Sequence, residues 1–142
     1  MPDPHKPEAM TQAFFTSLAE LEITAYEENL SHRFGVGSFC GSTDLNMHVA
    51  FIEPGNESRA HFHLRSDIAL FVLEGESTMI TWNQDYERTE RILKKGDFAF
   101  IPRGVIHKDV NHTDERFTLI ACYNNVGTGP ESLKVYVEDN PL

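Results

Sequence analysis

The stretch HFHLRSDIALFVLEGE, residues 61–76, decides the expected fold. It places His61 and His63 one residue apart and then runs through an apolar segment to Gly75. On a β-strand, residues i and i+2 point to the same face, about 7 Å apart, whereas a helix would splay them. Two imidazoles on one face of a strand can converge on a single metal ion, for which imidazole is the commonest protein ligand.

Short apolar or alternating runs surround this stretch, each bounded by Gly, Pro, Asn or Asp. They occupy residues 32–39, 45–53, 68–76, 78–82, 90–96, 98–102, 117–123 and 133–139. This pattern is typical of many short strands joined by tight turns, and it predicts an all-β sandwich or barrel.

The ends of the chain differ from this central region. Residues 1–10 carry three prolines, and residues 13–34 fit either a short helix or two extended pieces. We therefore predict an N-terminal arm and irregular segment over 1–32, one β-barrel domain over 33–137 and a tail over 138–142. The strand-like sequence SLKVYVED, residues 132–139, could add to the sheet edge of a neighbouring copy.

Composition narrows the classes of function. The 142 residues suffice for one domain. Twenty-two acidic against twelve basic residues give a net charge of −10, which disfavours binding to nucleic acid. The sequence begins without a basic segment followed by an apolar one, and no run approaches membrane-spanning length. We expect a cytoplasmic protein, without membrane or nucleic-acid partners, that acts on or binds a small molecule.

A second histidine segment, GDFAFIPRGVIHKDVN at residues 96–111, combines an apolar strand, a Pro-x-Gly turn, a histidine and an asparagine. Together the two segments resemble the paired motifs of the cupin family. The first motif is matched by Gly55, His61, His63 and Gly75, and the second by Gly96, Pro102, Gly104, His107 and Asn111.

The resemblance implies a small antiparallel jelly-roll β-barrel that pairs into homodimers. It also implies one divalent metal ion in the barrel lumen, held by His61, His63 and His107. We expect Fe(II), with Zn, Ni, Mn or Cu as alternatives. The other four histidines match no ligand position, although the strand of His48 could turn that side chain inward; they are His5, His32, His48 and His112.

The first cupin motif normally supplies a glutamate three or four residues after its second histidine, where this chain has Asp67 and Ile68. Counting back from Gly75 places Ile68 in that position, and alternation then aligns Ile68, Leu70 and Val72 on one face. An ion held by three neutral histidines keeps its full charge, so it could hold an anionic chelating substrate, or substrate plus dioxygen on iron. Alternatively, Asp67 could be a fourth ligand through a small bulge.

Further candidates flank the histidines. Asp109 shares a strand face with His107 and could be a general base, or it could face solvent beside Lys108. Arg59 and Arg103 could orient a carboxylate substrate or simply be solvated. Ile68 is a candidate for lining the substrate site.

The leading functional hypothesis is a metal-dependent enzyme, with dioxygenase-like oxidation of a small molecule as the favoured reaction and isomerase or lyase chemistry as alternatives. A different class, a non-catalytic ligand-binding or sensor cupin with a structural metal, would bind its ligand equally well after chelation. A structural barrel with an empty site would leave the three histidines without a role.

Overall fold

The computed structural model describes residues 13–27, 30–126 and 133–137, and within them every regular element longer than one turn is a β-strand. The elements are η1 (Leu18–Glu20), β1 (Thr24–Glu27), β2 (Leu30–Val36), η2 (Ser38–Cys40), β3 (Leu45–Ile52), β4 (His61–His63), β5 (Ile68–Glu74), β6 (Glu76–Trp82), β7 (Arg88–Lys94), β8 (Phe98–Ile101), β9 (Ile106–Val110), β10 (Phe117–Asn124) and β11 (Lys134–Tyr136). η1 and η2 are single 3-10 turns. No helix among these residues is long and apolar enough to cross a membrane.

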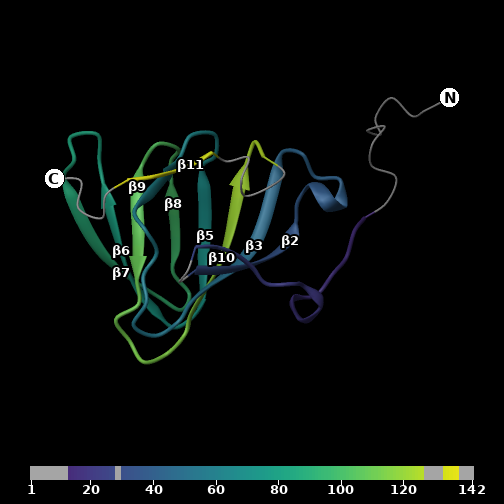
Figure 1. Cartoon of the computed structure of the whole chain (residues 1–142), viewed down its shortest axis with the longest axis horizontal. Helices are drawn as coiled ribbons and strands as arrows, with labels where there is room; N and C mark the ends of the chain where they lie inside the picture. Colours follow the sequence, from purple (N-terminus) through teal and green to yellow (C-terminus); the bar gives the residue numbers. More distant parts are fainter. Residues whose placement is uncertain (1–12, 28–29, 127–132, 138–142) are drawn as a thin grey trace.

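The strands form two antiparallel sheets. The six-stranded sheet has the order β1-β2-β3-β10-β5-β8, and the five-stranded sheet has the order β11-β4-β9-β6-β7 (Figure 1). Neighbours within each sheet are mostly distant in sequence, as in a jelly roll, and the predicted all-β jelly-roll class is confirmed.

The β-structure begins before residue 33, the predicted start of the barrel. Residues 24–27 and 30–32, predicted to belong to the arm, instead supply β1 and part of β2, and His32 pairs with Ala50 of β3. The pairing of β2 with β3, and of β1 with β2, thus selects the extended form in a region where local periodicity fitted either helix or strand. Near the other end, β11 pairs with β4 of the same chain. Residues 134–136 therefore do not add to the sheet edge of a neighbouring copy, as the sequence had suggested. Residues 1–12 and 138–142 lie outside the described residues.

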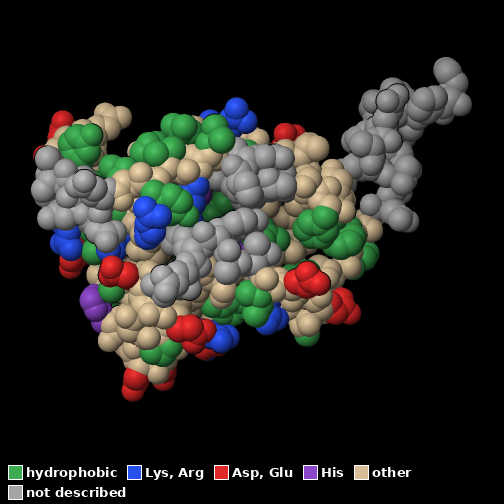
Figure 2. Space-filling model, viewed as in Figure 1, with side chains coloured by type: hydrophobic (Ala, Val, Ile, Leu, Met, Phe, Trp, Pro, Cys, Tyr) green, Lys and Arg blue, Asp and Glu red, His purple; other side chains and the backbone are tan. Residues whose placement is uncertain are grey.

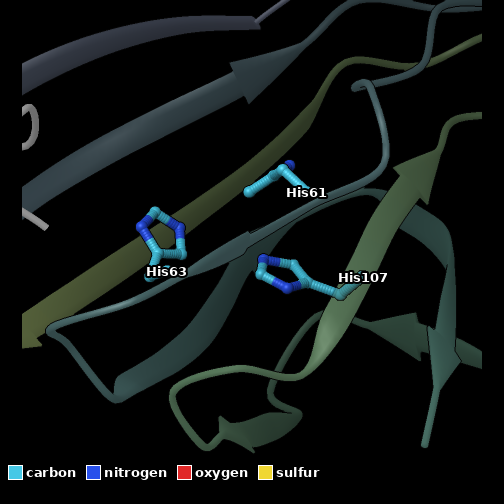
Figure 3. A group of neighbouring side chains, drawn as sticks. All are labelled: His61, His63 and His107. Carbon is cyan, nitrogen blue, oxygen red and sulfur yellow. The ribbon is translucent and has the colours of Figure 1, made fainter. Parts of the chain in front are cut away.

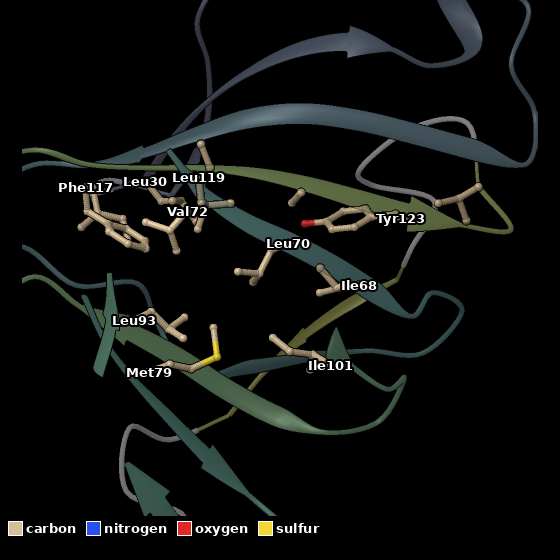
Figure 4. Close-up of a cluster of buried hydrophobic side chains, with 14 residues drawn as sticks. Leu30, Ile68, Leu70, Val72, Met79, Leu93, Ile101, Phe117, Leu119 and Tyr123 are labelled. Atoms are coloured by element: carbon tan, nitrogen blue, oxygen red, sulfur yellow. The ribbon is translucent and has the colours of Figure 1, made fainter. Parts of the chain in front are cut away.

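An apolar core fills one part of the space between the sheets (Figure 4). On β5, Ile68, Leu70 and Val72 are buried while Ala69 is exposed, so the alternation predicted for this strand is confirmed. Phe117, Met79 and their neighbours pack against these side chains. Burying a side chain of this size contributes about 1.5–3 kcal/mol, so the cluster holds the two sheets together.

Gly75 is the point where the chain passes from β5 in one sheet to β6 in the other. Its φ of +78° lies in the left-handed region, and a Cβ built there would collide with the carbonyl oxygen of Arg116. Only glycine meets both demands without strain or a backbone shift. Gly75 therefore fixes the crossing that places β5 opposite β4 and β9.

The surface mixes charge types. On the face shown in Figure 2, acidic, basic and hydrophobic side chains are interspersed. Several large apolar side chains are exposed, among them Phe98 (78%) and Phe100 (66%) on the edge strand β8.

Candidate metal centre

Three buried histidines, His61 and His63 of β4 and His107 of β9, converge between the sheets; we call them the histidine triad (Figure 3). The register pairs His61 directly with His107 across the two strands. Their potential ligand atoms all lie within 4.8 Å of one another. Two nitrogens bound to one ion at about 2.1 Å are at most about 4.2 Å apart, so small ring rotations would let all three bind a single ion.

Backbone carbonyls orient two of these rings. Nδ1 of His61 lies 2.7 Å from the carbonyl oxygen of Arg59, and Nδ1 of His107 lies 3.0 Å from that of Val105. A carbonyl can only accept, so each Nδ1 carries the proton and donates it, which leaves the Nε2 lone pair for a metal ion. The donor set therefore fits a divalent cation.

Electrostatics keep His61 and His63 in the protonation state that a metal requires. Burial lowers the pKa of His63 to about 3, and the charges of His107 and Lys134 add to the effect. Burial, followed by the charges of His107 and Lys134, also lowers the pKa of His61 well below its ordinary value. Both imidazoles are thus neutral at pH 7, the form that binds metal.

Asp67 is occupied by contacts outside the triad. Arg103 donates to its carboxylate from the backbone N–H (3.0 Å), Nε (3.2 Å) and Nη2 (3.1 Å), and Asn124 donates from Nδ2 (3.1 Å). Hydrogen bonds from Arg103, then from Asn124, hold the pKa of Asp67 below its usual range. Gly104, one residue further along the same turn, donates its N–H to the carbonyl of His63 at 2.9 Å. Asp67 thus braces the turn between β8 and β9.

A cavity of about 50 Å³ adjoins the triad between the sheets, and we call this space the lumen. His61 and His107 line it together with Ile68, which is 4% exposed. Asp109 also lines it and is buried, in contrast to the solvent-facing alternative. The Asp109 carboxylate accepts a hydrogen bond from the Ser77 hydroxyl at 3.1 Å.

The arginines considered as carboxylate ligands lie elsewhere. Arg59 and Arg103 are exposed, and neither is among the residues that line the lumen. The Arg59 guanidinium lies 4.2 Å from the ring centroid of Tyr136, and that of Arg103 binds Asp67.

Several lumen residues were not assigned a role from the sequence. His32 and His48, on the six-stranded sheet, are buried and line the lumen with Tyr123 and Lys134. Nδ1 of His48 lies 3.1 Å from Oδ1 of Asn46. Alternation along β3 was the available signal, because it places Asn46, His48, Ala50 and Ile52 on the buried face. Among the remaining histidines, His112 is exposed and His5 lies outside the described residues.

A larger hollow of about 320 Å³ lies on the outer face of the six-stranded sheet, between residues 14–21 and strands β2 and β3. Its lining is mainly apolar and includes Phe14, Met47 and Ile120. None of the triad residues belongs to it, so we place the candidate chemistry in the smaller lumen.

Comparisons with known proteins identify the fold and the family. Residues 48–123, over half of the chain, match the family model described as the cupin domain, and this segment contains the whole triad. The chain is 32% identical over 95 residues to germin-like protein subfamily 2 member 1 of Arabidopsis thaliana, covering 66% of this chain and 43% of that protein. It is 33% identical over 75 residues to an uncharacterized protein of Aquifex aeolicus (strain VF5), covering 53% and 57%. The chain thus spans about half the length of the curated relatives it matches.

Solved structures show the same fold at low sequence identity. An oxalate oxidase structure superposes with a TM-score of 0.74 at 19% identity, covering 93% of this chain and 68% of that one. A mutant of Bacillus subtilis oxalate decarboxylase gives a TM-score of 0.72 at 17% identity, covering 84% and 31%. At such identities the likeness concerns the fold alone. The jelly roll, the triad on its two strands and the family match together place this chain in the cupin family.

Proposed function

We propose that this cupin is a metal-dependent enzyme that oxidises a small organic molecule in the lumen. The observation that carries the proposal is the convergence of three buried imidazoles, two with their tautomers fixed by backbone carbonyls, beside a cavity between the sheets. A purely structural barrel would be destabilised by burying three imidazoles together, because buried polar groups cost free energy unless they are satisfied.

The proposed ligand set is His61, His63 and His107, without a carboxylate. Ile68 lines the lumen where the first cupin motif would supply glutamate, and the carboxylate of Asp67 is engaged by Arg103 and Asn124. A divalent ion bound by the triad would supply Lewis acidity, and a redox-active ion such as Fe(II) would also supply electrons for oxidation by dioxygen.

The chain itself would bind the substrate, keep water out and accept a proton. Ile68 and Leu70 give the lumen an apolar wall. Asp109, held by Ser77 on the same lumen, is the proposed general base, because its carboxylate can accept a proton from a bound substrate.

Fe(II) remains our preferred ion, with Zn, Ni, Mn and Cu as alternatives. Bacillus subtilis oxalate decarboxylase, a protein of similar fold, has Mn(II) centres, which makes Mn(II) the first alternative to compare. We also retain a cytoplasmic homodimer as part of the proposal. Exposed Phe98 and Phe100, with Phe71 packed 4.7 Å from Phe98 between ring centroids, support an association surface on the six-stranded sheet.

The decisive experiment is elemental analysis of protein purified without an affinity tag, followed by oxygen-uptake assays after reconstitution with Fe(II) or Mn(II). The substrate panel should contain diketones, thiols, aromatic diols and small carboxylates, and His107→Ala protein serves as the metal-free control. We expect about one ion per chain and metal-dependent oxygen uptake with at least one substrate. A folded wild-type protein that takes up no divalent ion would refute the metal site. Stoichiometric metal without turnover, combined with ligand binding that persists after chelation, would favour the non-catalytic binding function.

A further inference from the structure

The larger hollow on the outer face of the six-stranded sheet, which we call the outer hollow, takes no part in the proposed chemistry. Its volume of about 320 Å³ falls within the roughly 300–1,000 Å³ of small-molecule sites. His48 and Ala50 of β3 are buried on the lumen side, so Val49 between them faces the outer hollow. A ligand in this hollow would therefore lie across the sheet from the histidine triad.

Residues 14–21, which include η1, lie over one end of this sheet face, and we call them the strap. Phe14, Phe15 and Leu18 of the strap line the outer hollow, and all three are exposed, Phe15 by 87%. Apolar side chains that line a hollow and remain exposed lose contact with water when an apolar group enters, which favours binding.

The floor of the outer hollow is a row of side chains across three neighbouring strands. The register places Arg33 of β2 opposite Val49 of β3, and Val49 opposite Ile120 of β10. Directly opposite residues share a face of the sheet, and all three of these line the hollow. Neighbouring strands are about 4.8 Å apart, so the row spans roughly 10 Å. The floor thus has a cationic end at Arg33 and an apolar end at Ile120.

Arg33 is the one aspartate, glutamate, lysine or arginine among the described residues that line the outer hollow. Its Nη1 donates to the carbonyl oxygen of Leu18 at 3.1 Å, and its guanidinium lies 5.8 Å from the ring centroid of Phe51. Within the described part of the chain, no ion pair includes Arg33. Its Nε is shielded from water and has no hydrogen-bond partner among these residues. An anion beside this guanidinium would neutralise its charge and supply hydrogen-bond acceptors.

A second arginine on the same face of the sheet differs in this respect. The guanidinium of Arg116 also lies over Phe51, 5.0 Å from the ring centroid. Its Nε, however, binds Oε1 of Glu53 at 2.7 Å, and Arg116 is not among the described residues that line the outer hollow. The unpaired guanidinium of Arg33 therefore coincides with the hollow, while the paired guanidinium of Arg116 lies outside it.

We propose that the outer hollow binds a small amphiphilic anion, with its charged group at Arg33 and its apolar body on Val49 and Ile120. A carboxylate or sulfonate can accept two parallel hydrogen bonds from a guanidinium. Thr16 and Ser17, which directly precede Leu18, add hydroxyl groups to the lining. The row across the strands suits an apolar body roughly 10 Å long. This site is independent of the proposed metal-dependent function.

Binding of octanoate and of uncharged 1-octanol to the full-length protein, measured by calorimetry, tests the proposal. We expect wild-type protein to bind octanoate at least roughly tenfold more tightly than 1-octanol. Arg33→Gln removes the charge but keeps an N–H donor for the Leu18 carbonyl, so it should weaken octanoate binding and leave 1-octanol binding unchanged. A purely structural role of Arg33 would weaken the binding of both probes equally. Arg116→Gln is the matched control and should keep the preference for octanoate.

Two further variants locate the binding site. Gly35→Leu should abolish octanoate binding by filling the outer hollow, which Gly35 lines. A Cβ at Gly35 would meet only ordinary contacts, the nearest being Cδ1 of Leu21 at 3.6 Å, so the backbone tolerates a side chain there. His107→Ala alters the lumen on the other side of the sheet and should bind octanoate as tightly as the wild type. Circular dichroism checks that each variant folds.

The proposal is overturned if the wild type binds both probes equally, if Arg33→Gln binds octanoate as tightly as the wild type, or if His107→Ala abolishes octanoate binding. Absence of octanoate binding by the wild type would also overturn it. A dimeric mass in light scattering that Ile120→Lys lowers to the monomer mass would then identify a second copy of this chain as the occupant of the hollow. The comparison of the two probes on the wild type is decisive by itself if the variants do not fold.

Discussion

Substituting His107→Ala should abolish the stabilisation of the fold by a divalent ion. At an ion concentration one hundred times Kd, binding to the folded state alone adds about 2.7 kcal/mol to the free energy of unfolding. For a chain of this length each kcal/mol raises Tm by about 4 °C, so wild type should gain about 10 °C. Loss of one of the three imidazoles should reduce metal affinity at least roughly a hundredfold. Substituting a residue that only hydrogen-bonds to a metal ligand already reduces metal affinity roughly 10- to 100-fold. The stabilisation then falls to about 0.4 kcal/mol or less, a shift of at most about 2 °C.

The assay is thermal unfolding of metal-free protein with and without added Zn(II) or Mn(II), combined with elemental analysis. His112→Ala is the matched control, because it removes an exposed histidine away from the lumen and should keep the full metal-induced shift. Asp67→Ala is the discriminating variant. It should lower the Tm of the metal-free protein, because it deletes the contacts to Arg103 and Asn124, yet retain the metal-induced shift. Folded Asp67→Ala protein that loses the shift as completely as His107→Ala would show that Asp67 is a ligand and that the three-histidine reasoning is wrong.

Three other perturbations have definite expected outcomes. Gly75→Ala should lower the free energy of unfolding, measured by chemical denaturation, by about 3–5 kcal/mol, because positive-φ strain adds to the collision with Arg116. Gly55→Ala has open space at φ +75° and should lower it by only about 1 kcal/mol. Equal losses in the two variants would contradict the argument. The metal-free protein should lose stability as pH falls from about 6.5 toward 3, by up to about 1.4 kcal/mol per pH unit from His63 alone. In that window the unfolded state binds a proton at His63, whereas folded His63, with its pKa of about 3, does not. A free energy of unfolding that stays constant over this pH range would count against this reasoning. Ile68→Glu should destabilise the metal-free protein, because it buries a carboxyl group. The same variant should raise metal affinity by roughly tenfold or more, measured by competition with a chelator. Unchanged affinity would mean that residue 68 does not face the ion.

The triad could be predicted from sequence because its geometry is local. Alternate residues on a strand share a face, so His61 and His63 needed only the correct assignment of a strand, and the spacing around His107 supplied the second segment. The same reasoning placed Ile68, Leu70 and Val72 on one face, which the burial of β5 confirms.

Features that depend on distant pairing could not be predicted. Lys134 faces the lumen only because β11 pairs with β4, which lies far earlier in the chain. The contact of Asp67 with Arg103 spans 36 positions and arises because the turn before His107 folds back over the loop before β5. Periodicity over a few residues gives no information about which distant residue Lys134 or Asp67 will contact. The strands β1 and β2 were undecided for the same reason, since pairing of β2 with β3, and of β1 with β2, selects their extended form.

The division of the lumen between two sheets has a consequence for how such a protein can diversify. All three triad histidines, with Asp109 and Lys134, lie on the five-stranded sheet, whereas His48, Ile68 and Leu70 lie on the six-stranded sheet. Substitutions on the six-stranded sheet can therefore reshape the space offered to a ligand without moving the strands that orient the ion. The residues that would hold the ion and those that shape the ligand space lie on different sheets, so selection or a protein engineer can alter one set without the other.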